Sequence, residues 1–106
     1  MRFAVISDIH GNLAALEAVV ADFTRRGVDA VVNLGDALSG PLLPLETAHY
    51  LMATNWIHLA GNHERQVLTA PASRDDPADA FARRCLGAAD KHWMASLPHC
   101  RPWIDD

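Results

Sequence analysis

The sequence has little of several features that mark specialised classes of protein. It holds only two cysteines, Cys85 and Cys100, in neither a metal-like nor a redox-like spacing, so we expect two reduced thiols. No apolar run is long enough to span a bilayer, and no secretion signal follows Met1. We therefore expect a cytoplasmic protein with no membrane partner.

Positive charge is also scarce. Nine lysines and arginines face 13 aspartates and glutamates, which gives a net charge of −4. The basic residues occur singly or in pairs, so no basic stripe is available for a nucleic-acid backbone. Half of the 106 residues are apolar and 21% are charged, which is the usual mixture of a folded globular domain.

The first third of the chain has the pattern of a βαβ unit. Residues 2–6 form a short apolar run, typical of a buried strand. Residues 13–26 repeat apolar side chains at helical spacing and stop at Gly27. Residues 29–34 predict a second strand, which the right-handed crossover makes parallel to the first.

The remaining chain continues this alternation. We expect helices over residues 45–54, 62–68 and 79–97, the last broken at Gly87, and a third strand over residues 56–60. The predicted fold class is therefore α/β, with a βαβαβ parallel sheet and flanking helices. Trp103 and Ile104 resemble the approach to another strand, so residues 1–106 are predicted to be a single domain that is incomplete at its C-terminus.

Polar side chains follow each of the three predicted strands. Asp8 and His10 come after the first, Asp36 after the second, and Asn62 and His63 after the third. Strand alternation is expected to place Asp8 and His10 on the same side. Parallel strands end at one edge of a sheet, where ligands bind in open α/β folds. The sequence thus predicts one site built from all three strand ends.

These donors suit a divalent metal. Carboxylate, imidazole and amide groups favour Mn, Fe or Zn, with Mg also compatible. Asp36, between the other two strand ends, could bridge a pair of ions that activate a water for attack on a phosphoryl centre. His63 could protonate the leaving oxygen.

The motifs at residues 8–10, 35–36 and 61–64 resemble the first three signature motifs of the calcineurin-like metallophosphoesterases. Residues 7–12 are also similar to the bacterial phosphodiesterase-like branch of that family. The resemblance implies the first half of an α/β/β/α sandwich. It further implies that Asp8 and His10 hold the first metal, Asp36 bridges, Asn62 holds the second metal and His63 is the catalytic acid.

Two departures from the family pattern shape the expected function. Residues 37–40 replace the Asp-Arg-Gly of the protein phosphatases, with Ser39 standing where a carboxylate would orient His63. This favours the phosphodiesterase-like branch. The later Gly-His-x-His motif of the family does not occur in the sequence, so one metal is expected to be held better than two.

Two functional hypotheses follow. The first is a metal-dependent phosphoesterase that hydrolyses small phosphodiesters or phosphomonoesters through a metal-bound hydroxide. The alternative is a truncated half-domain with weak or no catalysis, which binds one metal or forms a homo-oligomer through an uncovered sheet face or edge. A nucleotide-binding module is less favoured because no Gly-x-Gly-x-x-Gly or Walker motif is present.

Overall fold

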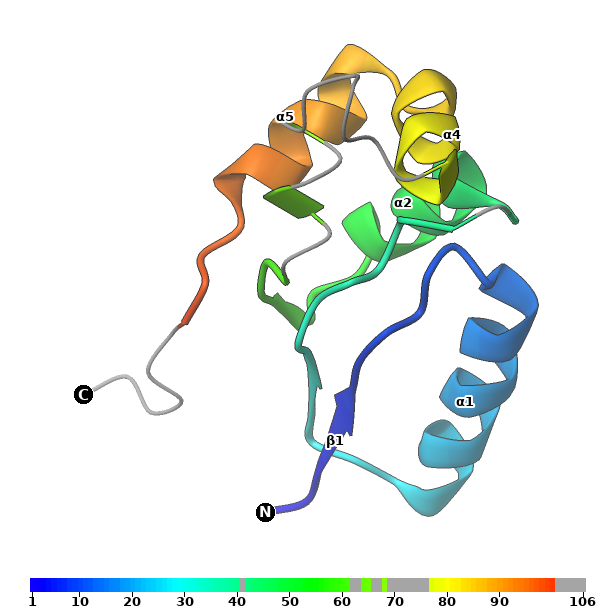
Figure 1. Ribbon diagram of the computed structural model, residues 1–106. Coiled ribbons are helices and arrows are strands. Elements are labelled where there is room, and N and C mark those ends of the chain that lie inside the picture. Colours follow the sequence, from blue (N-terminus) through cyan, green and yellow to red (C-terminus); the bar gives the residue numbers. More distant parts are fainter. Residues whose placement is uncertain (41, 62–63, 66–67, 69–76, 101–106) are drawn as a thin grey trace.

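The computed structural model describes residues 1–40, 42–61, 64–65, 68 and 77–100. In this part of the chain, a parallel three-stranded sheet has the order β1-β2-β3. The strands are β1 (Phe3–Ile6), β2 (Ala30–Asn33) and β3 (Ile57–His58). Figure 1 shows the sheet with α1 along one side and the other helices gathered around β3 and the strand ends. The predicted α/β class is confirmed.

Helix α1 (Leu13–Arg26) has the bounds expected from the sequence. The side chain of Asn12 caps its start by accepting the N–H of Ala15 at 3.1 Å. Gly27 ends it with a φ of 77°, and its N–H donates to the carbonyl of Phe23. Leu16 and Phe23 are the buried side chains of this helix, so α1 covers the sheet with one apolar stripe.

The other helices are α2 (Pro44–Met52), α4 (Pro77–Cys85) and α5 (Ala88–Ser96). Helix α2 contacts both α4 and α5. Their buried side chains join those of α1 and the loops in one apolar core (Ile9, Leu16, Ala37, Leu38, Ala48, Leu51, Ala82, Leu86, Met94).

No helix among the described residues is long and apolar enough to cross a membrane.

The predicted break at Gly87 is confirmed. Its N–H donates to the carboxylate of Asp90 at 2.7 Å, which starts α5 as a separate helix. The boundaries differ elsewhere. Helix α2 begins at Pro44 rather than at residue 45, because proline is well suited to the first helical position. Helix α4 begins at Pro77, two residues earlier than expected.

Strand β3 is shorter than the predicted run of residues 56–60. The N–H of Leu59 still donates to the carbonyl of Asn33, but that of Ala60 donates to the carbonyl of Pro98. The chain therefore leaves β2 after Leu59, and Ala60 bonds to the segment that follows α5. Of the predicted helix at residues 62–68, Glu64, Arg65 and Leu68 are helical. Asn62, His63 and the predicted strand approach at 103–104 lie outside the described residues.

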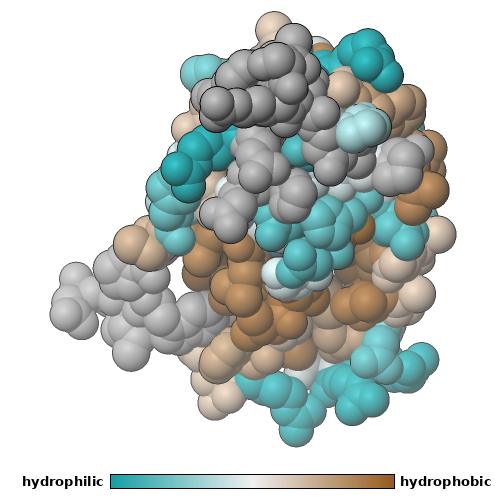
Figure 2. All heavy atoms as spheres, viewed as in Figure 1, coloured by the Kyte–Doolittle hydropathy of each residue, from teal (hydrophilic) through white to brown (hydrophobic). Residues whose placement is uncertain are grey.

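Strand β1 lies at an edge of the sheet described here and is poorly covered. Phe3 is 49% exposed and Val5 is 53% exposed. Figure 2 shows apolar side chains gathered on the face that carries the strands in Figure 1. Phe3 and Val5 lie on the same face of β1, so that face is poorly covered, while association through a sheet face or edge stays a prediction.

Candidate metal site

The turns after β1 and β2 remain joined beyond the strands themselves. The N–H groups of Asp8, His10 and Gly11 donate to the carbonyls of residues 35, 36 and 37 at 2.8–3.0 Å. Backbone pairing thus holds the two turns side by side. It brings the first two predicted strand-end motifs to the same edge of the sheet.

Three of the predicted site residues have left-handed backbone conformations. The φ angles are 58° at Asp8, 50° at His10 and 56° at Asp36. Few residues other than glycine adopt this conformation, and it persists only where the surrounding structure enforces it. Such outliers cluster at functional sites, so their coincidence with the predicted metal ligands is evidence for a site here.

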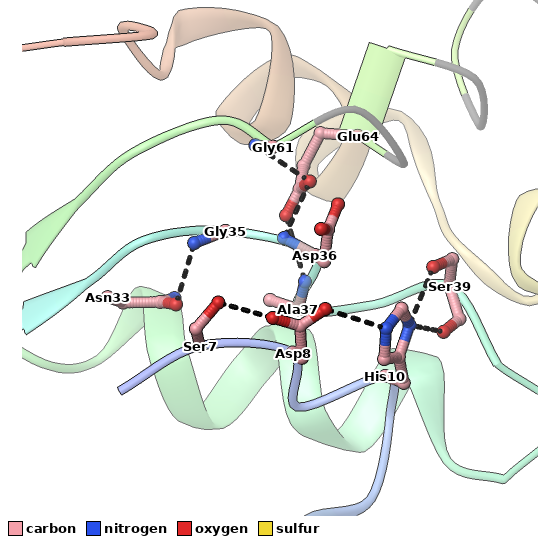
Figure 3. A network of polar contacts seen from close by, with 10 residues as sticks. All are labelled: Ser7, Asp8, His10, Asn33, Gly35, Asp36, Ala37, Ser39, Gly61 and Glu64. Atoms are coloured by element: carbon pink, nitrogen blue, oxygen red, sulfur yellow. Dashed lines mark hydrogen bonds and ion pairs between the residues drawn. The ribbon is translucent and has the colours of Figure 1, made fainter. Parts of the chain in front are cut away.

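Asp8 and His10 form a close pair at this edge (Figure 3). Nε2 of His10 lies 3.2 Å from Oδ1 of Asp8. On the other side of the ring, Nδ1 lies 2.7 Å from the carbonyl oxygen and 3.0 Å from the hydroxyl of Ser39. A carbonyl oxygen can only accept, so Nδ1 is the protonated nitrogen. In the neutral ring, the lone pair of Nε2 therefore faces the carboxylate.

The backbone conformation that brings Asp8 and His10 together was not indicated by the sequence. We expected strand alternation to align Asp8 with His10, but β1 ends at Ile6 and both residues lie in the following turn. The left-handed turn, rather than the pleat of a strand, brings them together. Ser39 was considered only as a replacement for a group that orients His63, whereas it contacts the ring of His10.

Asp36 lies against the turn that follows β3. A Cβ atom at Gly61 would come within 2.5 Å of Oδ1 of Asp36, so only glycine leaves room for this carboxylate. A Cβ atom at Gly35 would lie 2.3 Å from the backbone nitrogen of Gly61. The two glycines therefore let the β2 and β3 turns touch, and the close approach places Asp36 between the second and third motifs.

Glu64 joins the same turns, although the sequence interpretation gave it no role. Its side chain is buried, at 3% exposure. One carboxylate oxygen accepts the N–H groups of Asp36 (2.9 Å) and Gly61 (3.0 Å), and the other accepts that of Ala37 (2.9 Å), as Figure 3 shows. Glu64 is the last residue of the Gly-Asn-His-Glu motif. Its place in the motif could have drawn attention to it, but the sequence does not indicate this contact.

The structure assembles part of the predicted ligand set. Asp8 and His10 are in contact and Asp36 lies on the adjoining turn, while Asn62 and His63 lie outside the described residues. Within the described part of the chain, no three His, Cys, Asp or Glu side chains come together as a metal-holding group. The predicted roles of all five residues as ligands or acid therefore stay predictions.

Two other histidines, His49 and His58, lie away from the paired turns. His49 lies 3.2 Å from the carboxylate of Asp90, an ion pair whenever the ring is protonated. His58 is partly buried. The centroid of its ring lies 5.2 Å from that of Trp93. Burial lowers the pKa of His58 below its usual value.

Comparison with known proteins identifies the class. The family model of the calcineurin-like phosphoesterases matches residues 1–101, so the chain belongs to this family. The described sheet and helices are similar in fold to part of a metallophosphoesterase.

Individual relatives share only part of their length with this chain. An uncharacterized protein of Methanocaldococcus jannaschii is 42% identical over 65 residues, which cover 61% of this chain and 27% of that protein. The crystal structure of a metallophosphoesterase from Sphaerobacter thermophilus matches with a TM-score of 0.74 and 33% identity, over 92% of this chain and 41% of that one. A candidate diadenosine tetraphosphatase matches in fold alone, with a TM-score of 0.73 and 24% identity, over 92% of this chain and 43% of that one.

Members of the family generally bind divalent metals, and the donors at this edge suit such an ion. When the ring of His10 is neutral with its proton on Nδ1, its Nε2 lone pair and the Asp8 carboxylate are two acceptors 3.2 Å apart. Two acceptors at this distance repel each other unless a proton or a cation lies with them. Oxygen and imidazole nitrogen are ligands for Mn, Fe, Zn and related ions, so the residues present fit the group. The fixed Nδ1 contact to Ser39 is the usual support of a metal-binding imidazole.

Proposed function

We propose that the chain carries the metal-binding edge of a hydrolase that cleaves phosphodiester or phosphomonoester bonds of small molecules. The observation that supports this most directly is the Asp8–His10 pair, with Nδ1 of the imidazole held by the carbonyl of Ser39. That geometry places two possible metal ligands, a carboxylate oxygen and an imidazole nitrogen, next to each other at one end of the sheet, where the side chain of Asp8 is 61% exposed. Membership of the calcineurin-like phosphoesterases agrees with the reaction class.

In this proposal Asp8 and His10 would hold a first ion, Asp36 would bind both ions, and Asn62 would contribute to the second. A divalent metal supplies activation of the attacking water and neutralises charge on the phosphoryl oxygens. Manganese, iron and zinc are the candidate metals, one or two per chain. His63 donates a proton to the leaving oxygen as the ester P–O bond breaks, a contribution of about 10²–10⁴ in rate for a positioned acid.

The test combines metal binding with hydrolysis of a chromogenic phosphodiester in added Mn²⁺. Asp8→Asn keeps a residue type that tolerates the left-handed backbone, so it removes charge with little added strain. We expect it to lose Mn²⁺ affinity and Mn²⁺-dependent hydrolysis. Asp22→Asn is the matched control, because Asp22 is a carboxylate on α1 that pairs with Arg25 and Arg26. Equal rates and affinities in wild type, Asp8→Asn and control would reject the proposal.

A second candidate is a chain that binds one ion or self-associates and has little catalysis of its own. Two observations favour it: the exposed side chains of β1, and a sequence without the Gly-His-x-His motif of the family. Light scattering and metal analysis separate the two candidates. A monomer that turns over substrate supports the hydrolase, while an inactive oligomer with at most one ion per chain supports the second candidate.

A further inference from the structure

A line of hydrogen bonds behind the site ends on the turn that carries Asp36. Oδ1 of Asn33 accepts the N–H of Gly35 at 3.1 Å. The other end of that amide, Nδ2, lies 3.1 Å from Nδ1 of His58. Nε2 of His58 lies 2.8 Å from the hydroxyl of Thr54, which donates to the carbonyl of Leu51 at 2.7 Å. The line thus runs from the β2 turn to the end of α2.

Backbone groups at its two ends fix the direction of every bond in this line. The Gly35 N–H can only donate, so the oxygen of the Asn33 amide faces it and the NH₂ group faces His58. The Leu51 carbonyl can only accept, so Thr54 donates its one hydroxyl proton there and must accept from His58. His58 is therefore neutral, with its proton on Nε2 and an accepting Nδ1.

The surroundings of the ring suit this neutral form. Its described partners are Asn33 from β2, Thr54 from the segment after α2, the Leu51 backbone, and the rings of Trp56 and Trp93; burial, which favours the neutral form, outweighs the opposing effect of the Leu51 backbone on the pKa of His58. None of these contacts is with a charged or titratable group. Asn33 is 1% exposed, so water has little access to its amide and cannot readily replace His58 as a hydrogen-bond partner.

We propose that His58 is a positioning residue, which holds the Asn33 amide in the one orientation that binds the Gly35 N–H and so fixes the turn bearing Asp36. An acceptor is needed at the Nδ1 position of residue 58. Without it the NH₂ group of Asn33 loses its partner, and the amide is free to turn its oxygen away from Gly35. His58 reaches Asp36 only through Asn33 and Gly35 and takes no part in any chemical step.

The wild-type protein provides the first test. Nitrogen-15 spectra at neutral pH are expected to show His58 as the neutral ring with its proton on Nε2. A proton on Nδ1, or a charged ring, would overturn the inference, because Asn33 would then have to present its oxygen to His58 instead of to Gly35. This measurement needs no variant and no bound metal.

A matched pair of variants provides the second test. His58→Asn places an amide oxygen near the position of Nδ1, whereas His58→Leu fills the space without an acceptor. We expect the amide of Gly35 to exchange about five- to tenfold faster in His58→Leu, as for the loss of one neutral hydrogen bond, and His58→Asn to restore much of the protection. The Gly27 amide, bonded to the Phe23 carbonyl at 3.0 Å, serves as the internal control. Unchanged Gly35 exchange in His58→Leu, or equal exchange in both variants, would contradict the inference.

The consequence for catalysis rests on the proposed function. If the chain hydrolyses phosphoesters, His58→Leu should lower kcat more than it raises KM, and His58→Asn should recover part of the loss. Both structural tests are made without metal or substrate. A wild-type protein with the expected tautomer and exchange pattern but no hydrolysis would reject the proposed function and leave the positioning role of His58 standing.

Discussion

Glu64→Gln is the most informative single substitution for the integrity of the site. The carboxylate of Glu64 accepts three backbone N–H groups, two from the turn after β2 and one from the turn after β3. Glutamine has nearly the same shape, but it has one accepting oxygen where glutamate has two. If that oxygen keeps Asp36 and Gly61, the glutamine NH₂ group faces the N–H of Ala37, and two donors then oppose each other in a buried place.

The size of the effect follows from these contacts. A hydrogen bond to a charged group contributes about 1.5–3 kcal/mol, and the substitution removes at least one such bond. Because Glu64 is 3% exposed, water cannot readily satisfy the donor left behind. We expect the free energy of unfolding to fall by about 2–3 kcal/mol. For a domain of this size, each kcal/mol corresponds to about 4–8 °C in Tm.

Urea unfolding followed by circular dichroism measures this change. Glu17→Gln is the control, because Glu17 is an exposed glutamate on α1 and the same chemical change there should alter stability by less than about 0.5 kcal/mol. Under the proposed function, Glu64→Gln should also weaken Mn²⁺ binding, since the clamp fixes the backbone of Asp36. The reasoning is refuted if Glu64→Gln unfolds at the same urea concentration as Glu17→Gln.

Two further predictions concern the turns and the pH dependence. Gly35→Ala should destabilise the protein by about 1–3 kcal/mol more than Gly27→Ala, because both have positive φ but only Gly35 would bring a Cβ atom within 2.3 Å of Gly61; equal losses in thermal unfolding would contradict the close approach. Burial lowers the pKa of His58 in the folded state below its usual value of about 6.5. The unfolded chain therefore binds the proton more readily, and the free energy of unfolding should fall as pH drops below about 6.5. Urea titrations at several pH values should show a smaller fall in His58→Asn, and an equal fall would assign the pH dependence to other groups.

The elements that the sequence predicted best are those with local signals. Helix α1 has its expected bounds because an Asn cap, an apolar stripe and a terminal glycine agree on them. The break at Gly87 was likewise visible in the sequence. The prediction made strand β3 too long, because the point at which this strand ends depends on a hydrogen-bond partner far along the chain. Ala60 bonds to Pro98, and no pattern within residues 56–60 reveals that contact.

The sequence predicted that three of the candidate site residues would meet at one edge, but it did not predict their geometry. The order of motifs after parallel strands was enough to bring Asp8, His10 and Asp36 to one edge. Their left-handed backbones were not predictable, since Asp and His adopt that conformation more often than most residues but still in a small minority of cases. The role of Ser39 was missed for a related reason. Its contact with His10 spans 29 positions and depends on the paired turns.

The strain in these turns gives an independent reason to regard them as a functional site. Each left-handed residue that is not glycine costs about 1 kcal/mol or more, and three of them lie within two adjoining turns. The side chain of Asp8 does not offset this cost by burial, because it is 61% exposed. The turn after β2 is instead held by backbone hydrogen bonds to two buried side chains: Glu64 accepts the N–H of Asp36, and Asn33 accepts that of Gly35. Strained backbone that is held in place by buried hydrogen bonds is common where a protein preorganises groups for a ligand, so these turns agree with the metal site proposed above.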